Sequence, residues 1–137
     1  MKTVVVDASV AAKWFFPEEH SQAAKRLFSR RCQLIAPDLL AAEFGNLTWK
    51  RVRRRELTPD DASSLILDFF RLPLSLISSG PLLPIALDMA IDTGCSVYDC
   101  LYLALALNQD AVLVTADQRF ANTLANSPIA KNIRLIG

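Results

Sequence analysis

Four carboxylate side chains stand at positions where they could form one polar site: Asp7, Glu43, Asp99 and Asp117. Asp7 directly follows an apolar, β-branched run at residues 4–6, and Asp117 follows a second such run at residues 112–114. In an open parallel sheet, ligands bind outside the carboxyl ends of the strands. If both runs are strands of one such sheet, Asp7 and Asp117 reach the same edge and lie close together.

Glu43 is predicted to lie on or beside the buried stripe of a long helix at residues 38–55. It is four residues after Leu39 and four before Leu47, so the three side chains share one side of the helix. Asn46, three residues on, shares that side as well. A charge on a buried face costs several kcal/mol unless it is paired or bound to a cation. Glu43 therefore belongs either to a buried ion pair or to a cation site.

The other three carboxylates each have a simpler explanation as part of a helix start. Asp7 and Asp117 both precede a predicted helix, where Asp is a preferred N-cap residue. Residues 96–99, with the sequence SVYD, match the capping-box pattern with Asp in place of Glu. For each residue taken alone, capping and a shared site both remain open.

Convergence of these carboxylates would have a definite chemical consequence. Two carboxylates about 4 Å apart repel by roughly 1 kcal/mol in water, so a cluster is stable only if some protonate or a cation enters. Oxygen ligands favour Mg²⁺ or Mn²⁺ over zinc, and Mg²⁺ keeps waters that can attack a phosphodiester. Such chemistry needs no histidine. The single one, His20, lies in a polar stretch that predicts a surface position.

Several other chemistries are not favoured by the sequence. It contains neither the G-x-x-x-x-G-K-[ST] nor the G-x-G-x-x-G phosphate-binding pattern, and it has only four glycines. The three cysteines, Cys32, Cys95 and Cys100, include no C-x-x-C pair, which argues against a disulfide framework and a cysteine zinc site. We expect reduced thiols, with Cys95 and Cys100 as small core residues.

The elements that must position the carboxylates follow from composition and patterning. A chain of 137 residues with 52% hydrophobic residues predicts one folded domain, 1–137. Short apolar strands alternating with helices predict an α/β fold in which a parallel sheet lies between helices. The expected strands are residues 4–6, 34–36, 74–77, 112–114 and 133–136. The expected helices are residues 8–16, 18–31, 38–55, 59–71, 81–92 (or 84–92, since either Pro81 or Pro84 opens it), 96–108 and 117–124. Asp38 and Thr58 are predicted N-caps, and Gly94 is predicted to end a helix.

Four segments of the chain resemble a known family. They are VVDAS at residues 5–9, PDLLAAE at residues 37–43 with Asn46, VYDCLYLA at residues 97–104, and TADQRF at residues 115–120. In this order they resemble the PIN-domain family, and within it the VapC-type toxin ribonucleases of type II toxin–antitoxin pairs. The resemblance covers nearly the whole chain.

The resemblance implies a PIN-like three-layer fold with a parallel sheet of about five strands. It implies that the four carboxylates hold one or two Mg²⁺ or Mn²⁺ ions and activate water for RNA cleavage, with Asp7 and Asp99 as principal ligands. Ser9, Asn46 and Thr115 would be supporting residues. It further implies a homodimer and a cognate antitoxin protein that blocks the site.

The charge distribution suggests where RNA would be held. Residues 1–55 contain eleven Lys/Arg and five Asp/Glu, whereas residues 56–137 contain four and nine. A basic half suggests a polyanion partner. The densest run is a candidate for RNA binding and consists of Lys50, Arg51, Arg53, Arg54 and Arg55. The alternative role for this run is to complement the carboxyl end of the helix that carries Glu43.

The apolar segments of the chain bear on its cellular location and on its surface. The apolar run at residues 4–6 is too short for a signal peptide or a membrane span, so we expect a cytoplasmic protein without a membrane partner. Leu65, Ile66, Phe69 and Phe70 stripe one predicted helix, which indicates core packing or, alternatively, a dimer or antitoxin surface.

Three rival functions remain open. A phospho-receiver signalling domain also has an acidic Mg²⁺ pocket on a parallel sheet. It would need a phosphorylatable Asp after a middle strand, but no Asp follows residues 74–77 until Asp88, and only Lys131 stands close before the last strand. A catalytically silent binding module and a DNA-directed nuclease are the other two.

Overall fold

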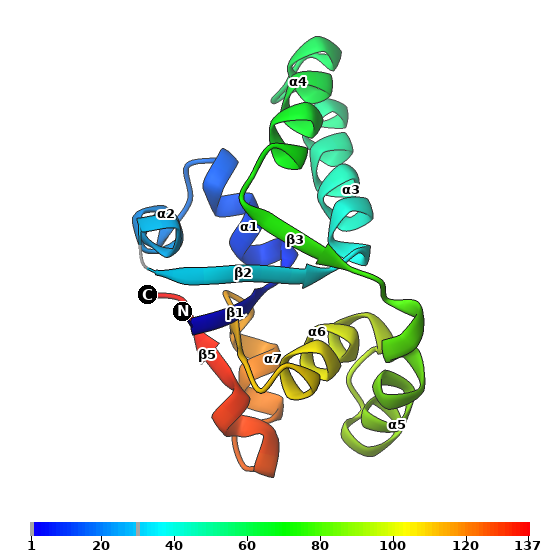
Figure 1. Ribbon diagram of the computed structural model, residues 1–137. Helices are drawn as coiled ribbons and strands as arrows, with labels where there is room; N and C mark the ends of the chain where they lie inside the picture. The colour runs from blue at the N-terminus through cyan, green and yellow to red at the C-terminus, as the bar shows by residue number, and fades with distance from the viewer. Residues whose placement is uncertain (1, 30) are drawn as a thin grey trace.

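The computed structural model describes residues 2–29 and 31–137, and its centre is a five-stranded parallel sheet (Figure 1). The strands are β1 (Lys2–Val6), β2 (Cys32–Pro37), β3 (Leu74–Ile77), β4 (Val112–Thr115) and β5 (Ile133–Leu135). Their order across the sheet is β3-β2-β1-β4-β5, and Val4 of the central strand pairs with Leu34 on one side and Val112 on the other. The predicted α/β class and five-stranded parallel sheet are confirmed.

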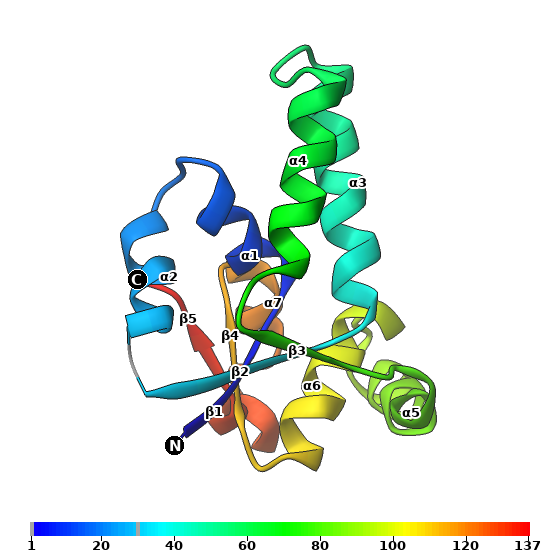
Figure 2. The same cartoon turned by 45° about the horizontal axis from the view of Figure 1, so that its top comes forward.

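Helices cover both faces of the sheet. They are α1 (Ala8–Phe15), α2 (Ser21–Ser29), α3 (Leu39–Arg53), α4 (Pro59–Phe70), α5 (Leu83–Thr93), α6 (Val97–Asn108) and α7 (Gln118–Thr123), with 3₁₀ turns at Gly80–Leu82 and Pro128–Asn132. In Figure 1, α1, α2 and α3 lie on one side of the sheet and α5, α6 and α7 on the other. Figure 2 shows α3 and α4 side by side as a hairpin that projects from the sheet.

The strand order contains a reversal that creates a binding crevice. From β1 the chain moves outward to β2 and then β3, and it afterwards returns to build β4 and β5 on the other side of β1. The direction therefore changes between β1 and β4. In open α/β sheets the crevice outside the carboxyl ends of the strands at such a point is the usual ligand site. Asp7 follows β1 directly, and Thr115 is the last residue of β4.

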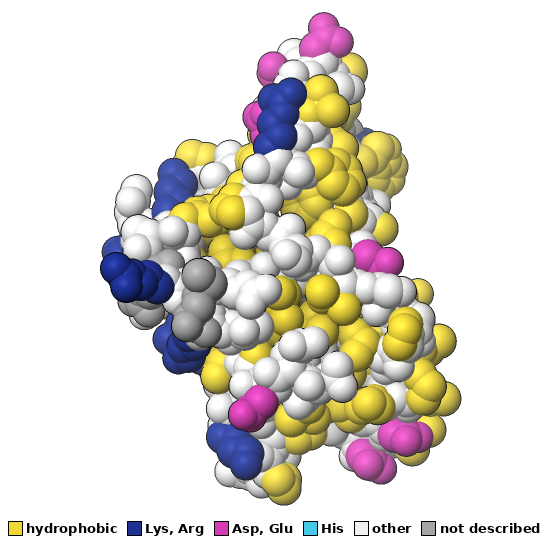
Figure 3. Space-filling model, viewed as in Figure 1, with side chains coloured by type: hydrophobic (Ala, Val, Ile, Leu, Met, Phe, Trp, Pro, Cys, Tyr) yellow, Lys and Arg dark blue, Asp and Glu magenta, His cyan; other side chains and the backbone are white. Residues whose placement is uncertain are grey.

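The core is built mainly from the central strands and α6. Seven consecutive residues of α6, from Cys100 to Ala106, are buried, as the apolar sequence of that helix predicts. Phe44 of α3 stacks on Phe69 of α4 with ring centroids 4.7 Å apart, which anchors the base of the hairpin. Phe70 departs from the predicted core stripe, because 62% of its surface is exposed. Exposed apolar side chains gather over α4 and α5 in Figure 3.

Two predictions about helix starts are wrong. The second helix begins at Ser21 rather than residue 18, because Glu18 is turned toward Lys13 and Arg51 and its backbone N–H bonds to the Ser21 hydroxyl. The predicted end of that helix includes Arg30, which lies outside the described residues. Asp38 precedes α3 but makes no side-chain cap, since its carboxylate instead accepts hydrogen bonds from the backbone N–H and hydroxyl of Ser79.

Two other predicted helix ends are confirmed. The Thr58 side chain accepts the backbone N–H of Asp61 and so caps α4. Gly94 ends α5 in the left-handed conformation, with a φ of 78°. Within residues 2–29 and 31–137, no single helix is long and apolar enough to cross a membrane. Only the pair formed by residues 80–93 and α6, bent by 116°, reaches the required length and composition.

Candidate active site

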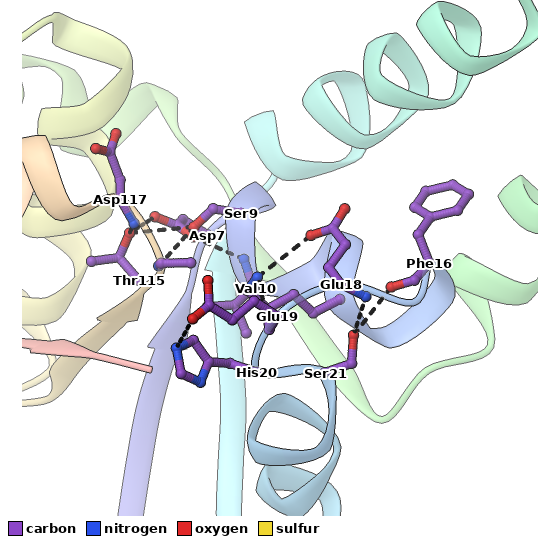
Figure 4. A network of polar contacts seen from close by, with 12 residues as sticks. Asp7, Ser9, Val10, Phe16, Glu18, Glu19, His20, Ser21, Thr115 and Asp117 are labelled. Carbon is purple, nitrogen blue, oxygen red and sulfur yellow. Dashed lines mark hydrogen bonds and ion pairs between the residues drawn. The ribbon is translucent and has the colours of Figure 1, made fainter. Parts of the chain in front are cut away.

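Asp7 lies at the reversal point of the sheet and is held by three hydrogen-bond donors (Figure 4). Its Oδ1 accepts the Ser9 hydroxyl at 2.5 Å and the backbone N–H of Val10 at 3.2 Å. Its Oδ2 accepts the Thr115 hydroxyl, which comes from the neighbouring strand β4. The bond from Val10 makes Asp7 the N-cap of α1, and the bond from Thr115 turns the same carboxylate toward the crevice between β1 and β4.

The two hydroxyls are oriented by the backbone of the turn that follows β4. The Ser9 Oγ accepts the N–H of Ala116 at 2.9 Å, and the Thr115 Oγ1 accepts the N–H of Asp117 at 3.1 Å. A hydroxyl has one proton, so each can accept from the backbone while donating that proton to Asp7. These bonds favour the ionised carboxylate, but burial outweighs them and raises the pKa of Asp7 above its ordinary value.

Glu43 lies on α3, half-buried, and is tied to the opposite side of the site by Tyr102 of α6. The Tyr102 hydroxyl donates to Oε1 of Glu43, and the tyrosine itself is only 3% exposed. Burial raises the pKa of Glu43, the Tyr102 bond lowers it, and the nearby charges of Asp7 and Asp99 raise it further. Burial and the bond to Glu43 raise the pKa of Tyr102, so its phenol remains a protonated donor.

The sequence patterns did not single out Tyr102 as a site residue. A signal was present, because Tyr102 follows Asp99 by three residues on a helix and therefore lies on the same side of it. A buried tyrosine hydroxyl also needs a hydrogen-bond partner. The partner, Glu43, is 59 residues away in the sequence, and no local pattern identifies it.

Asp99 and Asp117 complete the acidic set at the mouth of the site. Half of the predicted capping box is present, because the Ser96 hydroxyl accepts the N–H of Asp99 at 3.1 Å. Asp99 is half-buried; burial raises the pKa of its carboxylate, a hydrogen bond with the Ser96 side chain lowers it, and the charge of Asp117 raises it further. Asp117 caps α7 through the N–H of Phe120 at 3.0 Å, and its exposed carboxylate points away from Asp7 in Figure 4.

Comparison with protein families decides what kind of domain carries this site. The family model for the PIN domain matches residues 4–124. The chain belongs to the PIN domain family. It is 38% identical over 121 residues to Ribonuclease VapC3 of Pyrobaculum aerophilum, an alignment that covers 86% of this chain and 92% of that protein. The resemblance seen in the sequence is confirmed at the level of the family.

Solved structures agree with this PIN domain in fold. The crystal structure of PAE2754 from Pyrobaculum aerophilum matches with a TM-score of 0.70 at 24% identity, covering 98% of this chain and 89% of that one. VapBC2 from Rickettsia felis, solved bound to a DNA fragment from their promoter, matches with a TM-score of 0.67 at 13% identity. That match covers 98% of this chain and 99% of the other.

The donor set of this PIN domain fits a hard divalent cation in chemistry. Among the described residues, Oδ2 of Asp7 accepts one hydrogen bond, Oε2 of Glu43 accepts none, and the Asp99 carboxylate interacts only with the Ser96 side chain. Anionic oxygens with unused lone pairs are the ligands that Mg²⁺ and Mn²⁺ prefer. In residues 2–29 and 31–137, however, no three acidic, histidine or cysteine side chains stand close enough to share one ion. Shared coordination therefore needs rotation of the side chains at the mouth.

A cavity of about 610 Å³ opens beside the carboxylates of this PIN domain, between α1, α3 and the start of α6. Ser9, Glu43 and Ala116 line it where it meets the carboxylates. Asn46, predicted as a supporting residue, is exposed in this cavity one turn after Glu43 and makes no side-chain bond to the described carboxylates. Ser9 and Thr115, the other two, lie directly against Asp7.

The side chains of the basic run of this PIN domain point in different directions. Lys50 lines the cavity. Arg51 is turned the other way, because its guanidinium pairs with Glu18 at 3.0 Å and Glu56 at 3.4 Å and lies 3.9 Å from the centre of the Phe16 ring. The guanidinium of Arg53 lies 4.6 Å from the centre of the Trp49 ring. Arg54 and Arg55 are exposed at the end of the helix.

Proposed function

We propose that this protein is the toxin of a toxin–antitoxin pair and cleaves RNA as a divalent-metal-dependent endoribonuclease. The similarity to Ribonuclease VapC3 supports the reaction class, and the fold shared with VapBC2 supports the antitoxin partner. The observation that carries the proposal is the set of hydrogen bonds that holds the Asp7 carboxylate in place. Three donors hold this carboxylate at the reversal point of the sheet, and the other carboxylates stand around the same crevice.

Asp7, Glu43, Asp99 and Asp117 would together hold Mg²⁺ or Mn²⁺. When bound, such an ion lowers the pKa of a coordinated water and stabilises the charge that develops on a phosphate. Ser9 and Thr115 fix the direction of the Asp7 oxygens, and Tyr102 fixes one oxygen of Glu43. Two ligands are thus preorganised on rigid elements. Asp99 and Asp117, at the mouth, are able to adjust to the ion and the substrate.

The raised pKa values of Asp7, Glu43 and Asp99 are consistent with a set of carboxylates that binds a cation. Each carboxylate is disfavoured in its ionised form by burial, and two of the three are disfavoured further by a neighbouring carboxylate. A divalent cation reverses both effects, because it favours every ionised ligand at once. The same cation lets an anionic phosphodiester approach a site that would otherwise repel it.

We also propose, from the family resemblance, that the protein acts as a homodimer in the cytoplasm and that residues 1–137 form a single domain. An antitoxin that covers the carboxylates would suppress cleavage. Growth arrest on expression of the protein alone, relieved by the product of a small neighbouring gene, is the expected behaviour. Unchanged growth together with active RNA cleavage in vitro would contradict the toxin assignment but not the ribonuclease assignment.

The test of the reaction is cleavage of a mixed RNA pool by wild type, Asp7→Asn and the control Asp88→Asn. Asp88 is an exposed carboxylate on α5 outside the site, so its variant has the same charge change. We expect cleavage by wild type and Asp88→Asn with Mg²⁺ or Mn²⁺, and none by Asp7→Asn or by wild type in EDTA. Cleavage by Asp7→Asn at the wild-type rate would show the site to be wrong. Single-stranded DNA in a parallel reaction separates the ribonuclease from the DNA-directed rival.

A further inference from the structure

The cavity beside the carboxylates is a groove with two facing helical sides. On α3, Glu43, Asn46 and Lys50 line it at successive turns, and on α1 it is lined by Ser9 and Lys13. Glu43 and Lys50 are seven residues apart, which is about 10 Å along a helix axis. One strand of a duplex carries a phosphate about every 3.4 Å of the helix axis, and an unpaired strand is more extended, so this length corresponds to at most about three nucleotides. The groove therefore extends from the carboxylates over the length of a few nucleotides.

Two lysines, Lys13 and Lys50, line the part of the groove away from the carboxylates, and they differ in whether their charge is paired. Lys13 is only 8% exposed; its Nζ donates to the Glu19 carbonyl at 2.5 Å and pairs at 3.5 Å with Glu18, which also lines the groove, so its charge is largely balanced. Lys50 is half-buried, lines the groove, and forms no ion pair with any described residue. Its ammonium is the group available to a ligand. A strand with one phosphate at the carboxylates would bring a neighbouring phosphate toward Lys50.

An exposed aromatic ring stands at the mouth of the same groove. Tyr98 is 63% exposed and lines the groove, whereas the residues from Cys100 to Ala106 on the same helix are buried. Core packing therefore does not account for Tyr98. An exposed aromatic face beside a phosphate path is a stacking surface for a base, and such stacking tolerates any sequence. Bases in a duplex are already stacked and paired, so only an unpaired base can use this surface.

We propose that Lys50 holds the phosphate next to the cleavage site and that Tyr98 stacks on an unpaired base of the RNA strand lying in this groove. The inference rests on the proposed ribonuclease function and assigns two substrate-contacting residues to it. Ala12, Leu39 and Leu47 give the groove an apolar floor, which suits bases and riboses better than a second row of phosphates. The phosphates of a strand lying here face Lys50 while its bases face Tyr98.

The experiment measures RNA affinity separately from cleavage. All proteins are full-length and carry Asp7→Asn, which we expect to prevent cleavage, and thermal unfolding checks that each variant is folded. The probes are a short fluorescein-labelled oligoribonucleotide without self-complementarity and the duplex that it forms with its complement. The variants are Tyr98→Ala, Tyr98→Phe, Lys50→Ala and the control Lys25→Ala. Lys25 is an exposed lysine on α2 outside the groove and gives the same charge change as Lys50→Ala.

We expect Tyr98→Ala to weaken single-strand binding roughly 5-fold or more, because stacking contributes about 1–3 kcal/mol per base. Tyr98→Phe keeps the ring and should stay within about 2-fold of its parent. Lys50→Ala should reduce the slope of log K against log salt by about 0.7, the value for one single-strand phosphate contact. Lys25→Ala should leave the slope unchanged, and the duplex should bind more weakly than the single strand.

Three outcomes would overturn the inference. Equal affinities of Tyr98→Ala and its parent would mean that no base stacks there. Equal effects of Lys50→Ala and Lys25→Ala would mean that Lys50 holds no phosphate in the groove. Equal binding of duplex and single strand would contradict the unpaired substrate. If wild type cleaves RNA in these cases, only the groove assignment fails; absence of both cleavage and RNA binding contradicts the proposed function itself.

Discussion

Replacement of Tyr102 by Phe removes a single hydroxyl from the candidate site and leaves the buried ring in place. The lost interaction is the hydrogen bond to Oε1 of Glu43. Hydrogen bonds to charged groups contribute about 1.5–3 kcal/mol, and Glu43 is half-buried, so water can partly replace the donor. The lower limit applies, and we expect the free energy of unfolding to fall by about 1.5 kcal/mol, or the melting temperature by about 5 °C.

The more specific effect of Tyr102→Phe concerns the metal. A residue that orients a metal ligand typically changes metal affinity about 10- to 100-fold when it is mutated. The Mg²⁺ concentration for half-maximal RNA cleavage should therefore rise roughly 10-fold, while cleavage at saturating Mg²⁺ is largely restored. The readout is a Mg²⁺ titration of cleavage, with unfolding by urea measured on the same variants.

Thr48→Val is the matched control for this experiment. It also removes one buried hydroxyl, which donates to the Phe44 carbonyl at 2.9 Å on α3 but contacts none of the carboxylates. Thr48→Val should lose stability without any change in the Mg²⁺ requirement. If Tyr102→Phe and Thr48→Val shift the Mg²⁺ titration equally, Tyr102 has no role in positioning Glu43. An unfolding free energy of Tyr102→Phe equal to that of wild type would refute the strength assigned to the hydrogen bond.

Three further predictions concern stability. In EDTA, the unfolding free energy of wild type relative to Asp7→Asn should fall as the pH rises above about 4. Above that pH, Asp7 holds more protons in the folded state, where its pKa is raised, than in the unfolded chain. Urea titrations across pH measure this difference, and a flat or rising difference would contradict the prediction. Asp110→Gly should raise the free energy of unfolding by about 0.5–1 kcal/mol, because Asp110 ends α6 with a φ of 51°, which favours glycine. The next N–H, of Ala111, bonds back to the Ala106 carbonyl at 2.8 Å, as in a glycine-ended helix. Calorimetry would show no gain if that conformation is unstrained. Arg51→Ala should lower the free energy of unfolding by about 1 kcal/mol, because it removes two ion pairs and the Phe16 contact. Arg54→Ala should change it by less than about 0.5 kcal/mol. Equal losses in urea unfolding would contradict a structural role for Arg51 that Arg54 lacks.

Local patterns were sufficient for the framework of the fold. The strand at residues 74–77 was predicted with its observed ends, and the remaining strands and helices were placed to within a few residues. Those elements have strong local signals, such as the continuous apolar run of β1 between two covering layers and the Pro59 and Gly94 that begin and end helices. The placement of Asp7 at the crevice followed from the same information, because it needed only the position of one strand end.

The errors occur where a distant partner decides the local structure. Glu18 was assigned to a helix, but its side chain instead reaches Arg51, 33 residues away, and the helix starts later. Asp38 has the sequence of an N-cap, yet Ser79, 41 residues away, takes its carboxylate. Arg51 shares a basic run with Lys50, but only Lys50 lines the groove. In each case the competing interaction is stronger than the local preference, and sequence spacing does not reveal it.

The sequence leaves helix capping and participation in a site as alternatives for Asp7 and Asp117, but one carboxylate can do both. Its two oxygens separate the roles. In Asp7, Oδ1 takes the capping N–H of Val10 and Oδ2 takes the Thr115 hydroxyl across the crevice. In Asp117, Oδ1 takes the capping N–H of Phe120, and Oδ2 accepts no hydrogen bond from the described residues. In Asp7 the cap fixes the side chain at the edge of the sheet and so contributes to the preorganisation of the candidate metal site, whereas the exposed Asp117 carboxylate keeps one oxygen available while it adjusts to the ion.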